Sequence, residues 1–237
     1  MIEHIHEEYP EATMQARRDF AKVTKTPIVE KPYWFRDTDT KREYHGIYGA
    51  IGWPQKLSER GDELPGYGVI VGVLRDAGNK AEHAAFHVLE EAEHKAEDLL
   101  IQQCVQMRER WGYGVHKDIL PFFFGDYRPF ELTVAHFNTR LLEATGTDEH
   151  AFIVSPPDDF DQPNAFDIYM GRLRTVLSSE AKRLHLDNHE IIKNRILAFR
   201  RDDPAIMALG GLMHTLLIRS PWMEQTTPGI WQMPEEQ

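Results

Sequence analysis

Three aspartates occupy positions from which carboxylates can gather around divalent metal ions. Asp126 directly follows an apolar run at 122–125, and Asp202 and Asp203 precede the last strongly apolar helical segment. Active sites in open α/β sheets form at the carboxyl ends of strands. Hydrolysis of a phosphodiester by two metal ions needs about three carboxylates around ions roughly 4 Å apart, and carboxylate oxygens suit Mg²⁺ or Mn²⁺. The pattern therefore indicates Asp126, Asp203 and Asp202 as candidate catalytic residues.

These aspartates also have structural alternatives. Asp203 comes directly before Pro204, so its side chain is well placed to cap a helix, which contributes about 1 kcal/mol. Asp126 could instead begin a turn or pair with Arg128. Both alternatives stay open on the sequence alone.

The hydrophobic pattern predicts the elements that would position these residues. Apolar or alternating runs predict five strands, at 45–53, 67–74, 83–89, 119–124 and 151–154. Helical spacing predicts helices at 95–111 and from Pro129, Asn164, Asn188 and Asp203. Short connections favour an antiparallel meander of the first three strands, and the later alternation with helices favours parallel pairing. We therefore expect an α/β domain with a mixed five-stranded sheet flanked by helices, and a helical C-terminal third.

The two ends of the chain differ from this core. Residues 1–43 are predicted to form an N-terminal helix, at 7–24, and an extended, charged arm at 25–43 that contains Pro27 and Pro32. The core domain is expected at 44–223, and a polar tail at 224–237.

Composition limits the class of protein. The 237 residues are 41% hydrophobic, which supports a sizeable core, and include a single cysteine, Cys104, which falls on the apolar side of a helical pattern. One cysteine cannot form an internal disulfide or a multi-cysteine zinc site. No apolar run approaches the roughly 20 residues needed to span a bilayer, and residues 1–10 are charged and His-rich. These features favour a cytoplasmic protein without a membrane partner.

Charge is distributed unevenly along the chain. The formal net charge is −11, yet residues 167–201 carry eight Lys/Arg against four Asp/Glu, a net of +4. This basic segment is a candidate nucleic-acid surface, although a solvated helix face is the simpler interpretation. The candidate phosphate-binding residues are Arg172, Arg174, Lys182, Arg183, Lys193 and Arg195.

Four stretches together resemble a known family. They are a first strand YHGIYGAIGWP followed by GYGVIVGVL, a helix after the third strand, a strand ending FFFGD, and the late segment AFRRDDPAIMALGGLMHTLL. The element order resembles the ribonuclease H-like fold, and within it the chain is similar to the nuclease domain of phage large terminase subunits, over about residues 45–217. The resemblance implies a metal-dependent phosphodiesterase of DNA packaging or processing, with Mg²⁺ or Mn²⁺ as cofactor.

The resemblance also assigns roles to particular acids. The family takes one catalytic aspartate from the first strand, a second from the end of the fourth strand and a third near the last helix. Asp126 matches the second position, and Asp203 or Asp202 matches the third. Residues 47–53 contain no acid, so the first position is missing, and the nearest carboxylates are Asp62 and Glu63. The implied metal ligands are therefore Asp126 and Asp203, with Asp62 and Glu63 as possible substitutes.

Partners follow from the same resemblance. Double-stranded DNA is the implied substrate, and the setting is a phage or prophage protein in a bacterial host. The sequence contains no GxxxxGK[ST] phosphate loop, so an ATPase or another packaging subunit would come from a separate chain. The missing first acid leaves open a catalytically eroded fold that serves as a DNA- or protein-binding module.

Histidines suggest a second class of function. If residues 82–94 were helical, His83, His87, Glu91 and His94 would share one face, with the Glu-x-x-His spacing of metal-binding bundles. Glu3 and His6 have the same spacing. The sequence thus also allows a His/Glu metal-binding helical protein, or, as the plainer alternative, an exposed edge strand that carries His83 and His87.

Overall fold

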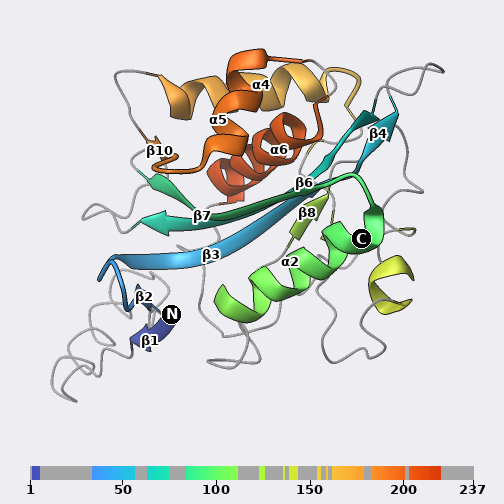
Figure 1. Ribbon diagram of the computed structural model, residues 1–237. Coiled ribbons are helices and arrows are strands. Elements are labelled where there is room, and N and C mark those ends of the chain that lie inside the picture. Colours follow the sequence, from blue (N-terminus) through green and yellow to red (C-terminus); the bar gives the residue numbers. More distant parts are fainter. Residues whose placement is uncertain are drawn as a thin grey trace, which may run out of the picture.

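The chain folds as an α/β domain with helices on both faces of a mixed sheet (Figure 1). This computed structural model describes residues 2–5, 34–56, 63–74, 84–111, 123–125, 136, 139–143, 154–155, 159, 162–178, 183–200 and 203–219. The predicted α/β class and mixed sheet are confirmed. The predicted helix at 7–24 and the tail at 224–237 lie outside the described residues.

Three long strands form the centre of the sheet. They are β3 (Glu43–Gly52), β6 (Gly66–Leu74) and β7 (Ala85–His94). β6 pairs antiparallel with both neighbours, as the short connections predicted. β6 is buried along almost its whole length, which explains why its β-branched sequence has no polar alternation.

Short parallel strands extend this meander at both edges. β8 (Phe123–Gly125) pairs with the second half of β3, and β9 (Val154–Ser155) pairs with β8. On the other edge, β10 (Leu184–His185) pairs with the start of β7. The resulting order is β9-β8-β3-β6-β7-β10. Each of the five predicted strands overlaps an observed strand, whereas β10 was not predicted.

The charged part of the predicted arm belongs to the sheet. β2 (Trp34–Asp37) pairs antiparallel with the start of β3, and β1 (Ile2–Ile5) pairs with β2. A turn at Thr38–Thr40 joins β2 to β3. The described part of the predicted extended arm, from residue 34, thus pairs with the sheet as an edge hairpin, which keeps its charged side chains near solvent.

Alternate residues of the strands face two separate cores. Ile47 and Ile51 of β3 pack with Cys104 of α2 (Glu97–Trp111) on one face. Tyr48 and Ala50 face the other core. Cys104 is fully buried there, which confirms its predicted role as a small core residue.

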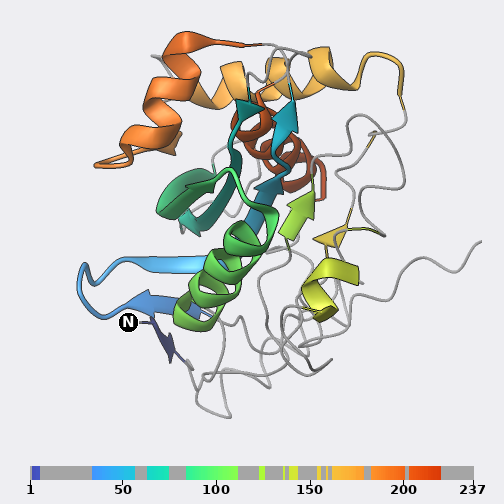
Figure 2. The same cartoon turned by 45° about the vertical axis from the view of Figure 1, so that its right-hand side comes forward.

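The second core lies under three helices. α4 (Ala165–Leu177), α5 (Glu190–Ala198) and α6 (Pro204–Arg219) cover the face opposite α2 (Figures 1 and 2). α6 is buried from Pro204 to Leu216, so it lies between α4 and the sheet. A separate small hairpin is formed by β4 (Gln55–Lys56) and β5 (Glu63–Leu64). None of the described helices is long and apolar enough to cross a membrane.

Candidate functional site

The carboxyl ends of strands β3 and β8 meet the start of helix α6 at one end of the sheet. Ile51 of β3 is paired with Gly125 of β8. The next residue, Gly52, lies so close to α6 that an added Cβ would be 2.3 Å from the carbonyl oxygen of Pro204. These are the three elements to which the sequence assigned the missing acid, Asp126 and Asp203.

Both carboxylate oxygens of Asp203 accept hydrogen bonds from the protein. Its Oδ1 accepts a hydrogen bond of 2.9 Å from the backbone N–H of Ala205, and its Oδ2 accepts one of 2.9 Å from Nη1 of Arg195. The residue is only 1% exposed. The first contact caps α6, and the second neutralises a buried charge. Both of these side-chain contacts are therefore those of the structural alternative for Asp203.

Arg195 supplies the positive charge at this edge. Its guanidinium joins Asp203 to Glu93 of β7, at 2.9 Å from each carboxylate, and its side chain is 13% exposed. Burial alone would lower the pKa of Arg195, but its hydrogen bonds to Glu93 and Asp203 raise it above the usual value. The Arg195 guanidinium thus lies between the carboxylates of Glu93 and Asp203 and neutralises negative charge that could otherwise attract a metal ion.

The other predicted metal ligands are not assembled by the described residues. Asp126, Asp202 and Asp62 lie outside them, so their placement is not described. Glu63 is exposed in the separate β4–β5 hairpin. No group of three or more His, Cys, Asp or Glu side chains able to hold a metal ion occurs among the residues that the structure describes.

The helical histidine interpretation was wrong. Residues 85–94 form strand β7, in which neighbouring side chains alternate between faces. His87 is buried on one face, and His94 accepts a hydrogen bond from the backbone N–H of Ala96. The two histidines therefore do not share the helical face on which the metal-bundle hypothesis depends. His83 and His6 lie outside the described residues.

The predicted phosphate-binding residues divide into two groups. Arg172 and Arg174 of α4 are exposed. Arg195 is engaged as above, and Arg183 donates from Nε to the carbonyl oxygen of Ala84 at 2.7 Å. These two cations hold the fold together, so their assignment to a phosphate-binding surface is corrected.

Two further predicted cations complete this comparison. Lys193 is also engaged within the chain, because it donates to the carbonyl oxygen of Asp187 and pairs with Glu190 near the surface. Lys182 lies outside the described residues. The exposed part of the predicted surface is therefore the α4 pair.

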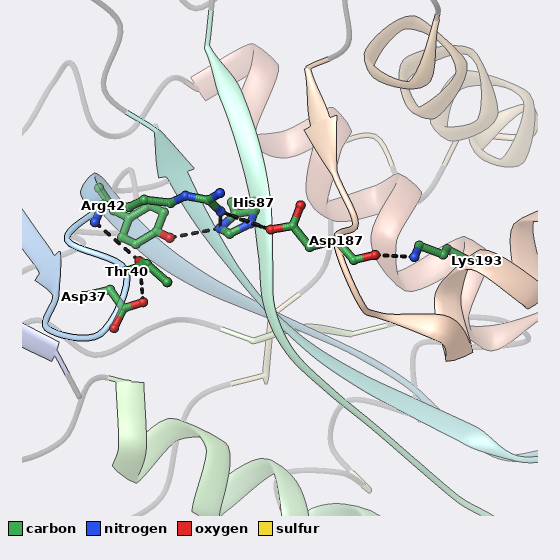
Figure 3. Close-up of polar contacts among 7 residues, drawn as sticks. Asp37, Thr40, Arg42, His87, Asp187 and Lys193 are labelled. Carbon is green, nitrogen blue, oxygen red and sulfur yellow. Dashed lines mark hydrogen bonds and ion pairs between the residues drawn. The ribbon is translucent and has the colours of Figure 1, made fainter.

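A polar cluster not predicted from the sequence lies at the opposite end of the sheet, where β3 and β7 begin. His87 is 5% exposed. Its Nε2 lies 2.5 Å from Oδ2 of Asp187, and its Nδ1 lies 2.9 Å from the hydroxyl of Tyr44. Arg42 donates to the same Asp187 oxygen at 3.1 Å. Figure 3 shows His87 between the side chains of Arg42 and Asp187.

Three side chains lie within hydrogen-bond distance of the His87 ring nitrogens: Asp187 at Nε2, Tyr44 at Nδ1 and the Arg42 guanidinium at both. Nε2 would have to carry a proton to donate to Asp187 and to lack one to accept from Arg42, so these contacts do not select one tautomer. Burial lowers the pKa of His87, although the hydrogen bond to Asp187 opposes this. The same hydrogen bond lowers the pKa of Asp187 to about 2, and burial raises that of Tyr44 to about 12. The cluster at neutral pH therefore contains a carboxylate, a neutral histidine and a neutral phenol.

An aspartate–histidine pair orients the general base of many enzymes. Here both ring nitrogens are used by Asp187 and Tyr44, and Tyr44 is fully buried. The cluster instead connects the β2–β3 hairpin, β7 and the β10–α5 connection. His87 was noted in the sequence only as an exposed strand residue or a metal ligand, because its acidic partner lies 100 residues away.

The adjoining turn is stabilised in the same region. Asp37 accepts a hydrogen bond from the Thr40 hydroxyl at 2.6 Å (Figure 3). It accepts another from the backbone N–H of Asp39 at 3.1 Å. Burial would raise the pKa of Asp37, but these hydrogen bonds lower it below the usual value. The turn thereby fixes the chain just before β3, where Arg42 reaches His87 and Asp187.

Glu91 is a second carboxylate of β7, besides Glu93, that stabilises the fold. It accepts hydrogen bonds of 3.0 Å from the backbone N–H groups of Ile191 and Ile192, and one of 3.1 Å from the Tyr67 hydroxyl. Those N–H groups belong to the first turn of α5, which has no side-chain cap of its own. Glu91 therefore caps α5 from a neighbouring strand.

Comparisons with known proteins give no relative for this chain. No protein-family model matches it, and no curated protein or solved structure matches it significantly. The class defined by the fold is therefore an α/β protein with a mixed sheet, and its function rests on the site geometry.

Proposed function

We propose that the chain contains a ribonuclease H-like domain of the terminase-nuclease type that acts on DNA in phage packaging or processing. The observation that carries the proposal is the convergence of β3, β8 and the start of α6, shown by the Ile51–Gly125 pairing and the close approach of Gly52 to Pro204. An antiparallel meander extended by parallel strands beside its first strand is compatible with that fold.

We infer further that DNA is bound and not cut by the domain. The first strand brings no acid at 47–53, and both oxygens of Asp203 are used by Ala205 and Arg195. A two-metal centre without these ligands would hold its ions weakly. A binding module that keeps the fold of a nuclease accounts for both observations.

Salt dependence of duplex binding tests this function. A fluorescein-labelled duplex of about 20 base pairs is titrated with the protein over a range of salt concentrations. We expect the affinity to fall steeply as salt rises, because each neutralised phosphate contributes about −0.9 to the logarithmic slope. Absent or salt-insensitive binding by folded protein would overturn the proposal.

A second candidate is retained hydrolysis with Mg²⁺ or Mn²⁺. It is favoured by one observation, namely that Asp126 directly follows Gly125 of β8, which is paired with β3. Calorimetric titration of Mn²⁺ into the protein separates the two candidates. Binding that is lost in Asp126→Asn would support a metal site, whereas the absence of saturable Mn²⁺ binding would support the DNA-binding module.

A further inference from the structure

Phe199 stands in an unusual position at the end of α5. Its φ of 33° and ψ of 79° lie in the left-handed region, and its backbone N–H bonds to the carbonyl oxygen of Arg195 at 3.0 Å. Glycine is the usual residue at such a helix end, because a side chain strains this conformation. The sequence nevertheless has a large aromatic residue here.

Burial does not explain the choice of phenylalanine. Phe199 is 47% exposed, and Leu197, two residues before it, is 82% exposed. The strained backbone is therefore offset by little transfer of the ring from water. An exposed aromatic side chain in a strained position is typical of a binding contact.

The surroundings of this ring are basic. The guanidinium carbon of Arg174 on α4 lies 5.8 Å from the ring centroid. The single acid of α4 is Asp167 in its first turn, and the single acid of α5 is Glu190 in its first turn, where it pairs with Lys193. Arg174 is thus the cation that lies beside the exposed ring, on a helix that carries no acid after Asp167.

A π-face next to an arginine suits an unstacked nucleobase with its phosphate. Bases stack on aromatic side chains in sequence-tolerant binding of single strands, and arginine adds cation–π and phosphate contacts. An acidic protein surface would match the arginine but would leave the aromatic face without a specific partner. Charge and ring together therefore favour a nucleic acid strand.

We propose that Phe199 and Arg174 form a contact site for single-stranded DNA, with a base stacked on Phe199 and a phosphate held by Arg174. This inference rests on the proposed function, because it specifies where and in what form the domain holds DNA. It places the contact on the helical layer, at the end of α5.

The competing explanation is that Phe199 fastens α5 to α4 through Arg174. The two explanations predict opposite changes in the melting temperature of Phe199→Gly. Phe199→Gly removes the ring and relieves the left-handed strain, so a DNA contact predicts an unchanged or higher melting temperature together with weaker binding. A fastening role predicts a lower melting temperature with unchanged affinity.

The experiment measures anisotropy of a fluorescein-labelled 20-nucleotide oligo(dT) with each variant, after circular dichroism has shown that it is folded. We expect Phe199→Gly to weaken binding by about 5- to 100-fold and Phe199→Trp to retain it, since one stacked base contributes at this level. Arg174→Ala should reduce the logarithmic salt slope by about 0.7.

Arg172→Ala is the matched control. It removes the same charge from the same helix, but two residues along an α-helix lie about 200° apart, so Arg172 faces away from Arg174. Equal losses from Arg172→Ala and Arg174→Ala, or equal affinities of the Phe199→Gly and Phe199→Trp proteins, would overturn the contact site. Wild-type protein that binds duplex but not oligo(dT) would overturn this inference alone, and protein that binds neither would also overturn the proposed function.

Discussion

Asp203, which was predicted to be a catalytic residue, has a structural role in the fold. It is 1% exposed, and its charge is balanced by Arg195, which also holds Glu93. A buried carboxylate that loses its partner keeps the full cost of desolvation. The residue is therefore sensitive to changes in Arg195 whether or not the domain cuts DNA.

Replacing Arg195 with methionine should be strongly destabilising. Asp203 would stay buried without a counter-charge, so we expect the free energy of unfolding to fall by about 3–5 kcal/mol. Urea denaturation measures the change, and Arg172→Met provides an exposed arginine on a neighbouring helix as a control. Addition of Asp203→Asn should recover part of the loss. A loss no larger than that of the control would contradict the assigned ion pair.

His87 should make stability depend on pH. Its folded-state pKa is lowered by burial, so the folded state disfavours the proton that the unfolded chain binds below about pH 6.5. Stability is then fully present above that pH and decreases as the pH falls below it. The groups that face His87 are Arg42, Tyr44, His185 and Asp187.

The pH dependence can be separated from that of the other histidines. Urea denaturation at pH 7.5 and pH 5.5 should show a smaller loss on acidification for His87→Gln than for wild type. His136→Gln, which changes a half-exposed histidine, should keep the wild-type loss. The same acid loss in all three proteins would refute the assignment. Asp187, whose pKa is about 2, should contribute a separate loss only as the pH falls from about 4 toward 2.

At the scale of elements, helices are held to the sheet by a few contacts between distant parts of the chain. Glu91 of β7 caps α5, and two glycines allow close approach of helices. An added Cβ at Gly68 would lie 2.5 Å from Sγ of Cys104 on α2, and one at Gly52 would lie 2.3 Å from the Pro204 carbonyl oxygen of α6. These contacts set how the two layers of helices lie on the strands.

Glu91→Ala should loosen the start of α5. Two backbone N–H groups would lose their acceptor, so we expect a loss of about 1–2 kcal/mol in the free energy of unfolding. Hydrogen exchange gives a more specific test, since the amides of Ile191 and Ile192 should lose protection first. Unchanged protection of these two amides would show that Glu91 is not the cap.

A second substitution should restore stability to Gly68→Ala but not to Gly52→Ala. Gly52→Ala and Gly68→Ala should each destabilise the fold by about 1–3 kcal/mol through overpacking. Shortening the neighbouring side chain by Cys104→Gly should relieve Gly68→Ala, whereas the backbone oxygen that blocks Gly52→Ala cannot be removed. Thermal melts of the single and double variants measure this. A Gly52→Ala protein as stable as wild type would contradict the close approach of α6 to β3.

At the scale of the whole molecule, local pattern predicted most elements but few of their contacts. The apolar run of β6 and the helical spacing of α6 were predicted because the residues that define them are neighbours in sequence. β2 was missed because its charged residues resemble a linker, and β10 because two residues carry no pattern. The His87–Asp187 pair could not be predicted, because no local pattern connects residues 100 positions apart.

The central claim is that this domain holds DNA on a nuclease-like fold without cutting it. Supercoiled plasmid incubated with the protein and Mn²⁺, beside Asp126→Asn and Asp203→Asn variants, tests it most directly. We predict a salt-sensitive shift of the intact plasmid by all three proteins, with no nicking above background. Nicking by wild type that disappears in Asp126→Asn would contradict the claim and establish an active metal-dependent nuclease.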